Sequence, residues 1–359
     1  MSAHYKFDCR GKQQGLSLVE LLIALVLGLV LMSGVIQVFI TTKQAYNLNE
    51  EMTWIQENAR FSMGFLSEDL RMAGYYGCAS RSNSVANVLN DPDSSWVTDF
   101  GKGLQGYDGD DVGFPALDFP RPETATLPNT MPKTDVFTVH RADLDNAIEV
   151  TGHVASSAVI STRVKHEYPD NSILVISDCH HSAVFQLTGK QDQKVNHNAG
   201  GSVSPGNCTK GLGIPVTCSA LGTGYTYKED AFVMRAIGHA YYIETASNLV
   251  PSLYRESLGA GTATVKEELV QGVENMQLQY GLDSNGDSIP DRYLDADDVP
   301  SASWESDVVT VRVTFLLRSL TELATEPQEF TYLGTSYTPT DKYIRRIYST
   351  TVKLRNRGV

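Results

Sequence analysis

A long apolar run near the start of the chain constrains the fold more than any other feature. Residues 16–40 hold a single charged side chain, that of Glu20. As a helix rising about 1.5 Å per residue, this run would extend about 37 Å, which exceeds the roughly 30 Å hydrocarbon core of a bilayer. It therefore predicts a membrane-spanning helix, in which a charge near the bilayer centre would cost roughly 2.5–3.5 kcal/mol.

The charges around this run predict its orientation. Lys6, Arg10 and Lys12 against Asp8 give residues 1–15 a net charge of 3 − 1 = +2, whereas the whole chain carries −13. Because positive flanks stay in the cytoplasm, we expect a single-pass inner-membrane protein with a cytoplasmic N-terminus and a periplasmic remainder. The acidic balance argues against nucleic acid as the primary partner.

The cysteines fit an oxidising compartment. Cys9 precedes the apolar run, and Cys78, Cys179, Cys208 and Cys218 follow it. Four cysteines in an exported domain favour two disulfides over free buried thiols, with three pairings open. Cys208 and Cys218 bracket a short loop that contains Gly and Pro, so we pair these two, which leaves Cys78 with Cys179.

The helical pattern continues beyond the membrane run. Residues 41–72 contain no Pro and one Gly, Gly64. Their apolar residues recur at three- and four-residue spacing, which predicts an amphipathic half over residues 41–77 of one helix of about 55 residues. The stripe expected to face the rest of the protein comprises Trp54, Ile55, Phe61, Phe65, Leu66 and Leu70.

Residues 78–359 read as a β-rich globular head. Asp, Ser, Gly and Pro are frequent in residues 80–134, which predicts long loops. Strand-like runs occupy residues 135–140, 172–178, 183–188, 231–244, 274–281, 307–319 and 343–357. In residues 309–318 apolar and polar side chains alternate, which predicts an antiparallel strand with one buried and one wet face. The expected fold class is α+β, with a long N-terminal helix packed on an antiparallel β-sheet head with long loops.

The opening stretch resembles a class III prepilin. A basic leader ends in "RGKQQG", whose last residue is Gly15, and Leu16 and Glu20 follow at the start of an apolar helix. This is the pattern of type IV pilins, minor pilins and type II secretion pseudopilins. The resemblance implies a pilin-like fold and a leader of residues 1–15, cut between Gly15 and Leu16 by prepilin peptidase, with N-methylation of Leu16. Most members begin with Phe, so Leu16 is a departure. The absence of Pro from residues 16–72 also departs from major pilins.

The resemblance gives Glu20 a role. In a filament such helices bundle with little water, and a buried carboxylate persists only if it is paired. The implied partner is the new α-amino group of Leu16 in a neighbouring subunit, which would set the register between subunits. The alternative is a Glu near the helix start whose carboxylate reaches the lipid headgroups.

Later segments narrow the resemblance to minor pilins of the PilW type. They are "QENARFSMGFLSEDLRMAGYYGC" (residues 56–78), "ISDCHHSAVFQLT" (176–188) and "RRIYSTTVKLRNR" (345–357). This implies a minor pilin that joins other minor pilins and the major pilin, initiates pilus assembly and serves motility, adhesion or DNA uptake. The first alternative is a GspJ-like pseudopilin of a type II secretion system. The more remote alternative is a membrane-anchored periplasmic enzyme or binding protein.

One acidic loop, "DSNGDSIPDRYLDADD" (residues 283–298), resembles the start of an EF-hand calcium loop. Its oxygen side chains at positions one, three, five and nine are those of Asp283, Asn285, Asp287 and Asp291. Ser288 stands where such loops have Gly, and Leu294 where they have a bidentate Glu. The sequence therefore leaves two readings, a structural calcium site or an acidic turn between strands.

No catalytic motif is present. The sequence lacks His-Glu-x-x-His, Cys-x-x-Cys, Gly-x-Ser-x-Gly, P-loop and Gly-x-Gly-x-x-Gly patterns. Cys179, His180 and His181 are adjacent on a strand end, so their side chains would point to opposite faces rather than to one metal. We therefore expect a protein that is not an enzyme and requires no cofactor.

Overall fold

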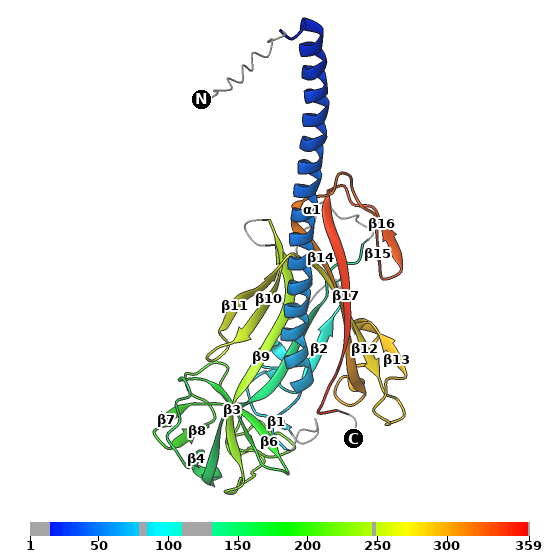
Figure 1. The fold of residues 1–359 in the computed structure, drawn as a ribbon. Helices are drawn as coiled ribbons and strands as arrows, with labels where there is room; N and C mark the ends of the chain where they lie inside the picture. The colour runs from blue at the N-terminus through cyan, green and yellow to red at the C-terminus, as the bar shows by residue number, and fades with distance from the viewer. Residues whose placement is uncertain (1–14, 79–84, 110–130, 246–248, 358–359) are drawn as a thin grey trace, which may run out of the picture. The chain divides into compact units, whose positions relative to one another are not determined.

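The computed structural model describes residues 15–78, 85–109, 131–245 and 249–357. The chain divides into two compact units, Met1–Met52 and Thr53–Val359, each of which is described by itself. One helix, α1 (Leu18–Met72), contributes to both units (Figure 1). The fold class is the predicted α+β, a long N-terminal helix followed by a largely antiparallel β region. The predicted leader lies outside the described residues except for Gly15.

Within the first unit, α1 is an uncovered apolar helix. The large apolar side chains from Leu16 to Ile40 are 43–77% exposed, and this part of α1 is long and apolar enough to cross a membrane. No break occurs at the predicted boundary between residues 40 and 41, because neither Pro nor a helix-ending Gly interrupts the backbone hydrogen bonds there. Such a surface is stable only in lipid or against other apolar surfaces.

In the second unit, the remainder of α1 buries one stripe. Its buried residues are Ile55, Ala59, Ser62, Leu66, Asp69 and Leu70. The prediction that Phe61 and Phe65 share this stripe is wrong, since these side chains are 59% and 37% exposed. The buried residues repeat at spacings of three and four, and Phe65 lies about 100° round the helix from Leu66. Two aromatic rings are thus left on an outer flank of the helix.

The larger sheet has eleven strands among the described residues. They are β1 (Val85–Asn87), β2 (Leu104–Tyr107), β3 (Val136–Val154), β4 (Val159–Thr162), β5 (Ile173–Ser177), β6 (Ser182–Gln186), β7 (Gly189–Gln191), β8 (Lys194–Asn196), β9 (Phe232–Thr245), β10 (Pro251–Leu258) and β11 (Thr264–Gln271). The order is β1-β6-β5-β9-β3-β4-β8-β7, with β10 and then β11 added beside β9, and β2 beside β3. All pairs are antiparallel except β1 with β6. β1 and β2 lie in a segment that the sequence predicted as loop.

The centre of this sheet is buried on both faces. On β5, Ile173 and Val175 pack into one apolar cluster with Tyr76, Phe100 and other residues. Leu174 and Ile176 face the opposite cluster. An uninterrupted apolar run is the pattern expected of a strand covered on both sides, which explains why "ILVI" shows no alternation.

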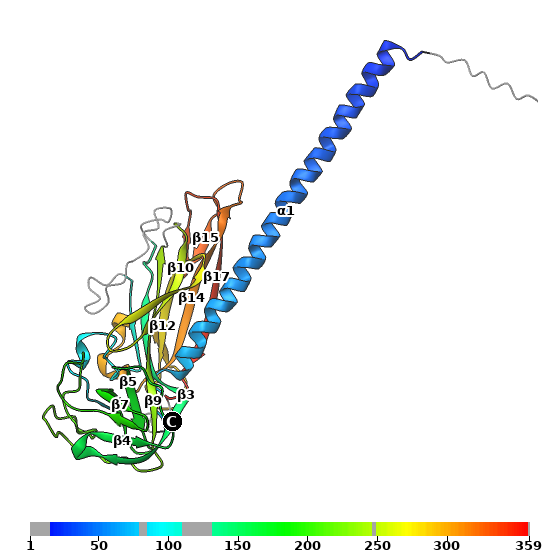
Figure 2. The ribbon, with the colours of Figure 1, turned by 90° about the vertical axis from the view of Figure 1, so that its left-hand side faces the viewer.

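A second sheet has the order β13-β12-β14-β17 (Figures 1 and 2). Its strands are β12 (Val273–Leu282), β13 (Arg292–Leu294), β14 (Val308–Glu322) and β17 (Tyr343–Lys353), and a separate hairpin joins β15 (Phe330–Tyr332) to β16 (Thr335–Tyr337). Single 3-10 turns are η2 (Pro92–Ser94), η3 (Ala155–Ser157), η4 (Ala296–Asp298) and η5 (Ser301–Ser303).

The expected wet face of β14 is a second error of prediction. Thr310, Thr314 and Arg318 are buried along with their apolar neighbours, whereas Arg312 on the same face is half-buried. The face is covered because Leu316 packs against Tyr332 and Tyr337 of the β15–β16 hairpin. The alternation of apolar and polar residues therefore predicts the antiparallel pairing of β14 correctly but predicts the solvent exposure of its polar face wrongly.

A buried ion network joins strands of this sheet. Arg345 of β17 donates to both carboxylate oxygens of Glu274, at 2.6 and 3.0 Å, and to those of Asp341, at 2.7 Å each. Both carboxylates are buried with it. Because every partner of this charge is itself hydrogen-bonded, the network holds the start of β17 in one register against its neighbours.

Candidate functional site

The N-terminus of α1 is closed by a capping box. The Ser17 N–H donates to Glu20 Oε2 at 3.0 Å, and the Glu20 N–H donates to the Ser17 hydroxyl at 3.2 Å. Ser-x-x-Glu is the pattern that satisfies two free helix amides reciprocally. The sequence contains this signal, which offers Glu20 a partner within its own chain. In the isolated chain, then, Glu20 already has a partner.

The predicted cleavage bond lies immediately before this cap. Gly15 and Leu16 precede α1 and are exposed. A Cβ added to Gly15 would meet no atom within 4 Å. Nothing in the described part of the chain therefore requires glycine at this position.

Asp69 anchors α1 to the larger sheet. Its carboxylate, 5% exposed, accepts hydrogen bonds from Arg141 Nε at 3.0 Å, from the Tyr241 hydroxyl at 2.6 Å and from His239 Nδ1. Burial alone would raise the pKa of Asp69, but the hydrogen bond and charge of His239, with Tyr241 and Arg141, lower it to about 2. One carboxylate thus ties the helix to β3 and β9. Sequence reasoning missed it because an Asp on an amphipathic helix reads as solvent-facing.

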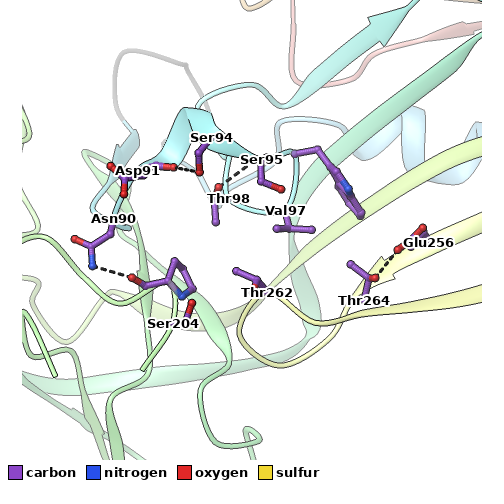
Figure 3. A pocket seen from close by; sticks show the side chains of 12 residues that line it. Asn90, Asp91, Ser94, Ser95, Val97, Thr98, Ser204, Glu256, Thr262 and Thr264 are labelled. Atoms are coloured by element: carbon purple, nitrogen blue, oxygen red, sulfur yellow. Dashed lines mark hydrogen bonds between the residues drawn. The ribbon is translucent and has the colours of Figure 1, made fainter. Parts of the chain in front are cut away.

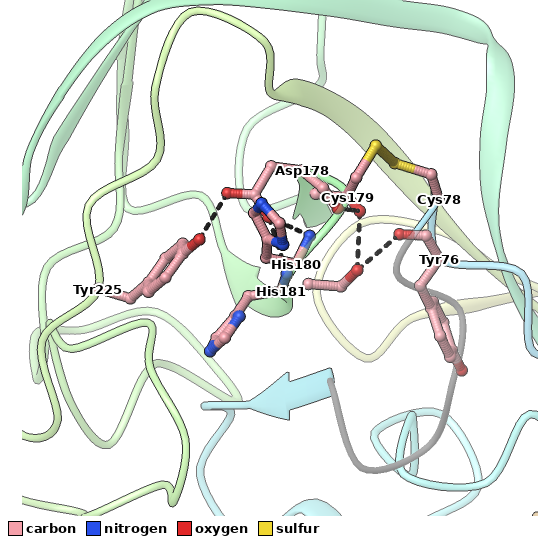
Figure 4. Close-up of a disulfide and its surroundings, with 9 residues drawn as sticks. Tyr76, Cys78, Asp178, Cys179, His180, His181 and Tyr225 are labelled. Carbon is pink, nitrogen blue, oxygen red and sulfur yellow. Dashed lines mark hydrogen bonds between the residues drawn. A yellow bond between two sulfur atoms is a disulfide. The ribbon is translucent and has the colours of Figure 1, made fainter.

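The two disulfides join the pairs expected from the sequence. Cys78, just beyond α1, is bonded to Cys179 in the turn between β5 and β6 (Figure 4), and Cys208 is bonded to Cys218. The first closes a loop of 101 residues and links the end of the helix to the sheet. The second closes a loop of 10 residues. Cross-links of this kind stabilise mainly by restricting the unfolded chain, more so for the longer loop.

The polar residues around Cys179 shape a turn. Asp178 Oδ1 accepts the N–H groups of His180 and His181 at 2.8 and 2.7 Å, and Oδ2 accepts the Tyr225 hydroxyl at 2.8 Å (Figure 4). Cys179 is oxidised and the carboxylate of Asp178 is occupied, so this cluster offers no open set of ligands to a metal.

The acidic loop between β12 and β13 is held by its own hydrogen bonds. Asp283 accepts the N–H groups of Asn285, Gly286 and Ser288 at 3.1, 2.7 and 2.7 Å, and Asp291 accepts others. Burial raises the pKa of Asp283, but these amides hold it below its usual value. Among the described residues, no group of three or more acidic, His or Cys side chains is arranged to hold a metal. Calcium binding here stays a prediction.

Two histidines that the sequence left unconnected meet inside the head. His153 Nε2 lies 3.1 Å from His197 Nε2, and the Tyr227 N–H reaches His153 Nδ1 at 3.3 Å. Since Nδ1 of His153 accepts, its Nε2 donates to His197. Burial lowers the pKa of His153 to about 4 and that of His197 to about 3. Both rings are therefore neutral at neutral pH, and the pair is a buried structural contact.

A polar cavity of about 570 Å³ opens beside the β10–β11 hairpin (Figure 3). Residues 90–98, 204–205 and 256–264 contribute its walls, which carry Ser and Thr hydroxyls and the carboxylates of Asp91 and Glu256. Glu256 accepts hydrogen bonds from the hydroxyls of Thr264 and Tyr242. No His, Lys, Arg or Cys is found in the described lining, so it holds hydroxyl groups without a histidine base beside them.

Comparison with known families bears on both ends of the chain. Residues 10–36 match the prokaryotic N-terminal methylation motif. Residues 240–356, about a third of the chain, match the Type IV pilus-assembly protein W family, PilW. Over these two segments the chain is similar to PilW-type, type IV pilin-like proteins. The match with the PilW family model begins near the end of β9 and therefore includes the whole second sheet and the strands β10 and β11 of the first.

Comparisons with individual proteins add little. No curated protein sequence matches the chain. Among solved structures, the type IV-like pilin TTHA1219 from Thermus thermophilus is similar at 12% identity over 52% of this chain and 84% of that chain, with a TM-score of 0.22. A TM-score this low carries no argument about function.

Proposed function

We propose that the protein is a minor pilin of a type IV pilus, cleaved between Gly15 and Leu16 and methylated on Leu16 by prepilin peptidase. The observation that carries this proposal is the methylation motif at residues 10–36, which overlaps an apolar helix whose large side chains are exposed among the described residues. A processing motif together with an exposed apolar helix is what we expect of a pilus subunit before its assembly.

The head would lie in the periplasm and the N-terminus in the cytoplasm. Basic residues precede the apolar run, and cytoplasmic retention of positive flanks sets this orientation. Two disulfides follow it, as suits an oxidising compartment. After cleavage, the helix would leave lipid only for another apolar environment, a bundle of helices from other minor pilins and the major pilin. There the chain would take part in initiating pili that serve motility, adhesion or DNA uptake.

Glu20 would change partners on assembly. Cleavage creates an α-amino group on Leu16, directly before the capping box. In a dry bundle an unpaired carboxylate is far more costly than in the headgroup region. Pairing with the Leu16 amine of a neighbour would remove that cost and fix the axial register of the two helices.

Variants separate this role from capping. Glu20→Gln keeps a side chain that can cap, but removes the charge, whereas Ser17→Ala removes the capping hydroxyl and keeps the charge. We expect both chains to insert and to be cleaved, with Glu20→Gln strongly depleted from sheared pili and Ser17→Ala incorporated normally. Mass spectrometry of the mature chain checks processing, by loss of residues 1–15 and gain of one methyl group. An intact N-terminus in the wild type would refute the minor-pilin proposal, and normal incorporation of Glu20→Gln would refute the register argument.

A further inference from the structure

One long strand, β17, uses only one of its two edges. It pairs with β14 and has no second partner strand among the described residues. The Ile344 N–H donates to the Ser319 hydroxyl at 3.0 Å and the Leu354 N–H to the Val309 carbonyl at 2.9 Å, both acceptors on β14. Because backbone groups alternate between the two edges of a strand, the even-numbered residues face β14 and the odd-numbered residues face outward.

The outward edge is open over a stretch of uncharged residues. Ile347, Ser349 and Thr351 are exposed, and no loop or turn in the described chain bonds to this edge between residues 347 and 353. Proteins commonly protect an exposed edge with charges, Pro or a bulge. None of these interrupts "IYSTTV", residues 347–352, whose register with β14 is regular.

Helix α1 lies beside this edge without closing it. Figures 1 and 2 both show β17 alongside the second half of α1. The Arg355 N–H, the next outward group, donates to the Arg71 carbonyl at 3.1 Å, where helix and strand end together. A groove of about 430 Å³ lies beside this contact, lined by helix residues from Met63 to Met72 and by Arg355, just beyond β17.

A second open edge has the opposite charge. Among the described residues β11 pairs only with β10, and its residues 264–268 are exposed. These five residues hold Glu267 and Glu268 against Lys266, a net charge of −1. The open edge of β17 is flanked by exposed Arg346, Lys353 and Arg355, with no acidic residue from 343 to 357 in a chain of net charge −13. In Figure 1, β11 lies at the left of the head, and β17 lies on the other side of α1 from it.

We propose that two copies of this chain associate head to tail, with the β17 edge of one copy pairing with the β11 edge of the other. The backbone groups of both edges would then be satisfied, and a continuous sheet would cross the subunit boundary. Because the two edges are different surfaces of one head, the contact is heterologous and leaves an open edge at each end of the pair. Charge complementarity favours this partner over a second β17, which would bring cations together.

The test removes one outward N–H from the full-length protein in detergent micelles. Thr351→Pro deletes the Thr351 donor but leaves the even-numbered bonds to β14 intact, since Pro is tolerated at outward positions of edge strands. Thr351→Ala is the matched control, because it shortens the side chain and keeps the N–H. Analytical ultracentrifugation should show about a tenfold or greater rise in the dissociation constant for Thr351→Pro and no change for Thr351→Ala. Association through α1 contributes equally to the wild type and both variants. A difference between their dissociation constants therefore reflects pairing at the β17 edge alone.

Hydrogen exchange gives the second readout. The amides of residues 347, 349, 351 and 353 should exchange more slowly at high protein concentration than after dilution, together with amides of β11. The even-numbered amides of β17 should be protected in both conditions, and thermal unfolding followed by circular dichroism confirms that Thr351→Pro is folded. A wild type that stays monomeric, equal association of Thr351→Pro and wild type, or odd-numbered amides indifferent to concentration would each overturn the proposal.

Discussion

Replacement of Asp69 by Asn tests how the second half of α1 is held on the head. Asn keeps the shape and can still accept from the Tyr241 hydroxyl, but it removes the charge that Arg141 and His239 share. Those two side chains are 16% and 13% exposed, so water would replace the lost partner only in part. We therefore expect the variant to fold with reduced stability.

The size of the loss follows from the pKa of Asp69. Its fall from 3.8 to about 2 is about 1.8 units, or roughly 2.4 kcal/mol at 1.36 kcal/mol per unit. Leaving a buried partner unpaired typically costs about 3–5 kcal/mol, and the residual exposure of Arg141 and His239 points to the lower end. Asp69→Asn should thus lower the free energy of unfolding of the head by about 2–3 kcal/mol at neutral pH.

The effect of Asp69→Asn on stability should depend on pH in a definite direction. A depressed pKa in the folded state stabilises the protein above the unfolded pKa, and this contribution is lost as the pH falls through the folded value. The difference between wild type and Asp69→Asn should therefore shrink between about pH 4 and about pH 2. Urea unfolding in detergent, followed by tryptophan fluorescence, measures it. Glu68→Gln, an exposed neighbour on the same helix, is the matched control and should leave stability unchanged. A loss below about 0.5 kcal/mol for Asp69→Asn, or a difference independent of pH in this range, would refute the reasoning.

Two further predictions concern the rest of the head. Calcium should raise the melting temperature by several degrees relative to excess chelator, because an ion bound only by the folded loop stabilises the folded protein. Asp287→Asn should remove this increase, which differential scanning fluorimetry measures. Equal melting temperatures with and without calcium would contradict the site. His197→Gln should reduce the acid-induced loss of stability, because His197, with a pKa of about 3, stays neutral in the folded protein while it is protonated in the unfolded chain below about pH 6.5. The slope of unfolding free energy against pH should fall by about 1.4 kcal/mol per pH unit between about pH 6 and about pH 4, and an unchanged slope would exclude this contribution.

The elements that the sequence predicted well are those governed by local pattern. The continuous helix follows from the absence of Pro in residues 16–72, and β5, β9 and β14 follow from runs of apolar and β-branched residues. The two disulfide pairs follow from one short loop and elimination. Each of these depends on neighbours in the chain, or on so few candidates that tertiary structure adds little information.

The errors all depend on what covers a surface. Phe61 and Phe65 have helical spacing relative to other apolar residues, yet only the sheet decides which flank of α1 is buried. Thr314 and Arg318 read as wet until the β15–β16 hairpin covers them. Asp69 reads as exposed until Arg141 and His239, about 70 and 170 residues away in the chain, supply its partners. The spacing of apolar residues and the local composition predict helices and paired strands. Which of their faces is buried depends on contacts between segments that are distant in the sequence.

The capping box indicates how the Glu20 carboxylate would be paired before and after the proposed assembly. A capping interaction contributes about 1 kcal/mol, which suits a helix start in the headgroup region, where Ser17 and Glu20 satisfy each other without any other subunit. In a helix bundle the same carboxylate faces a desolvation cost of several kcal/mol unless a cation pairs with it, and the capping amides carry no full charge. In the proposed pathway, cleavage would supply that cation on Leu16. We therefore expect uncleaved chains to remain stable in the membrane and to be excluded from filaments. In the headgroup region the capping amides are enough to stabilise the Glu20 carboxylate, whereas in a dry helix bundle they are not.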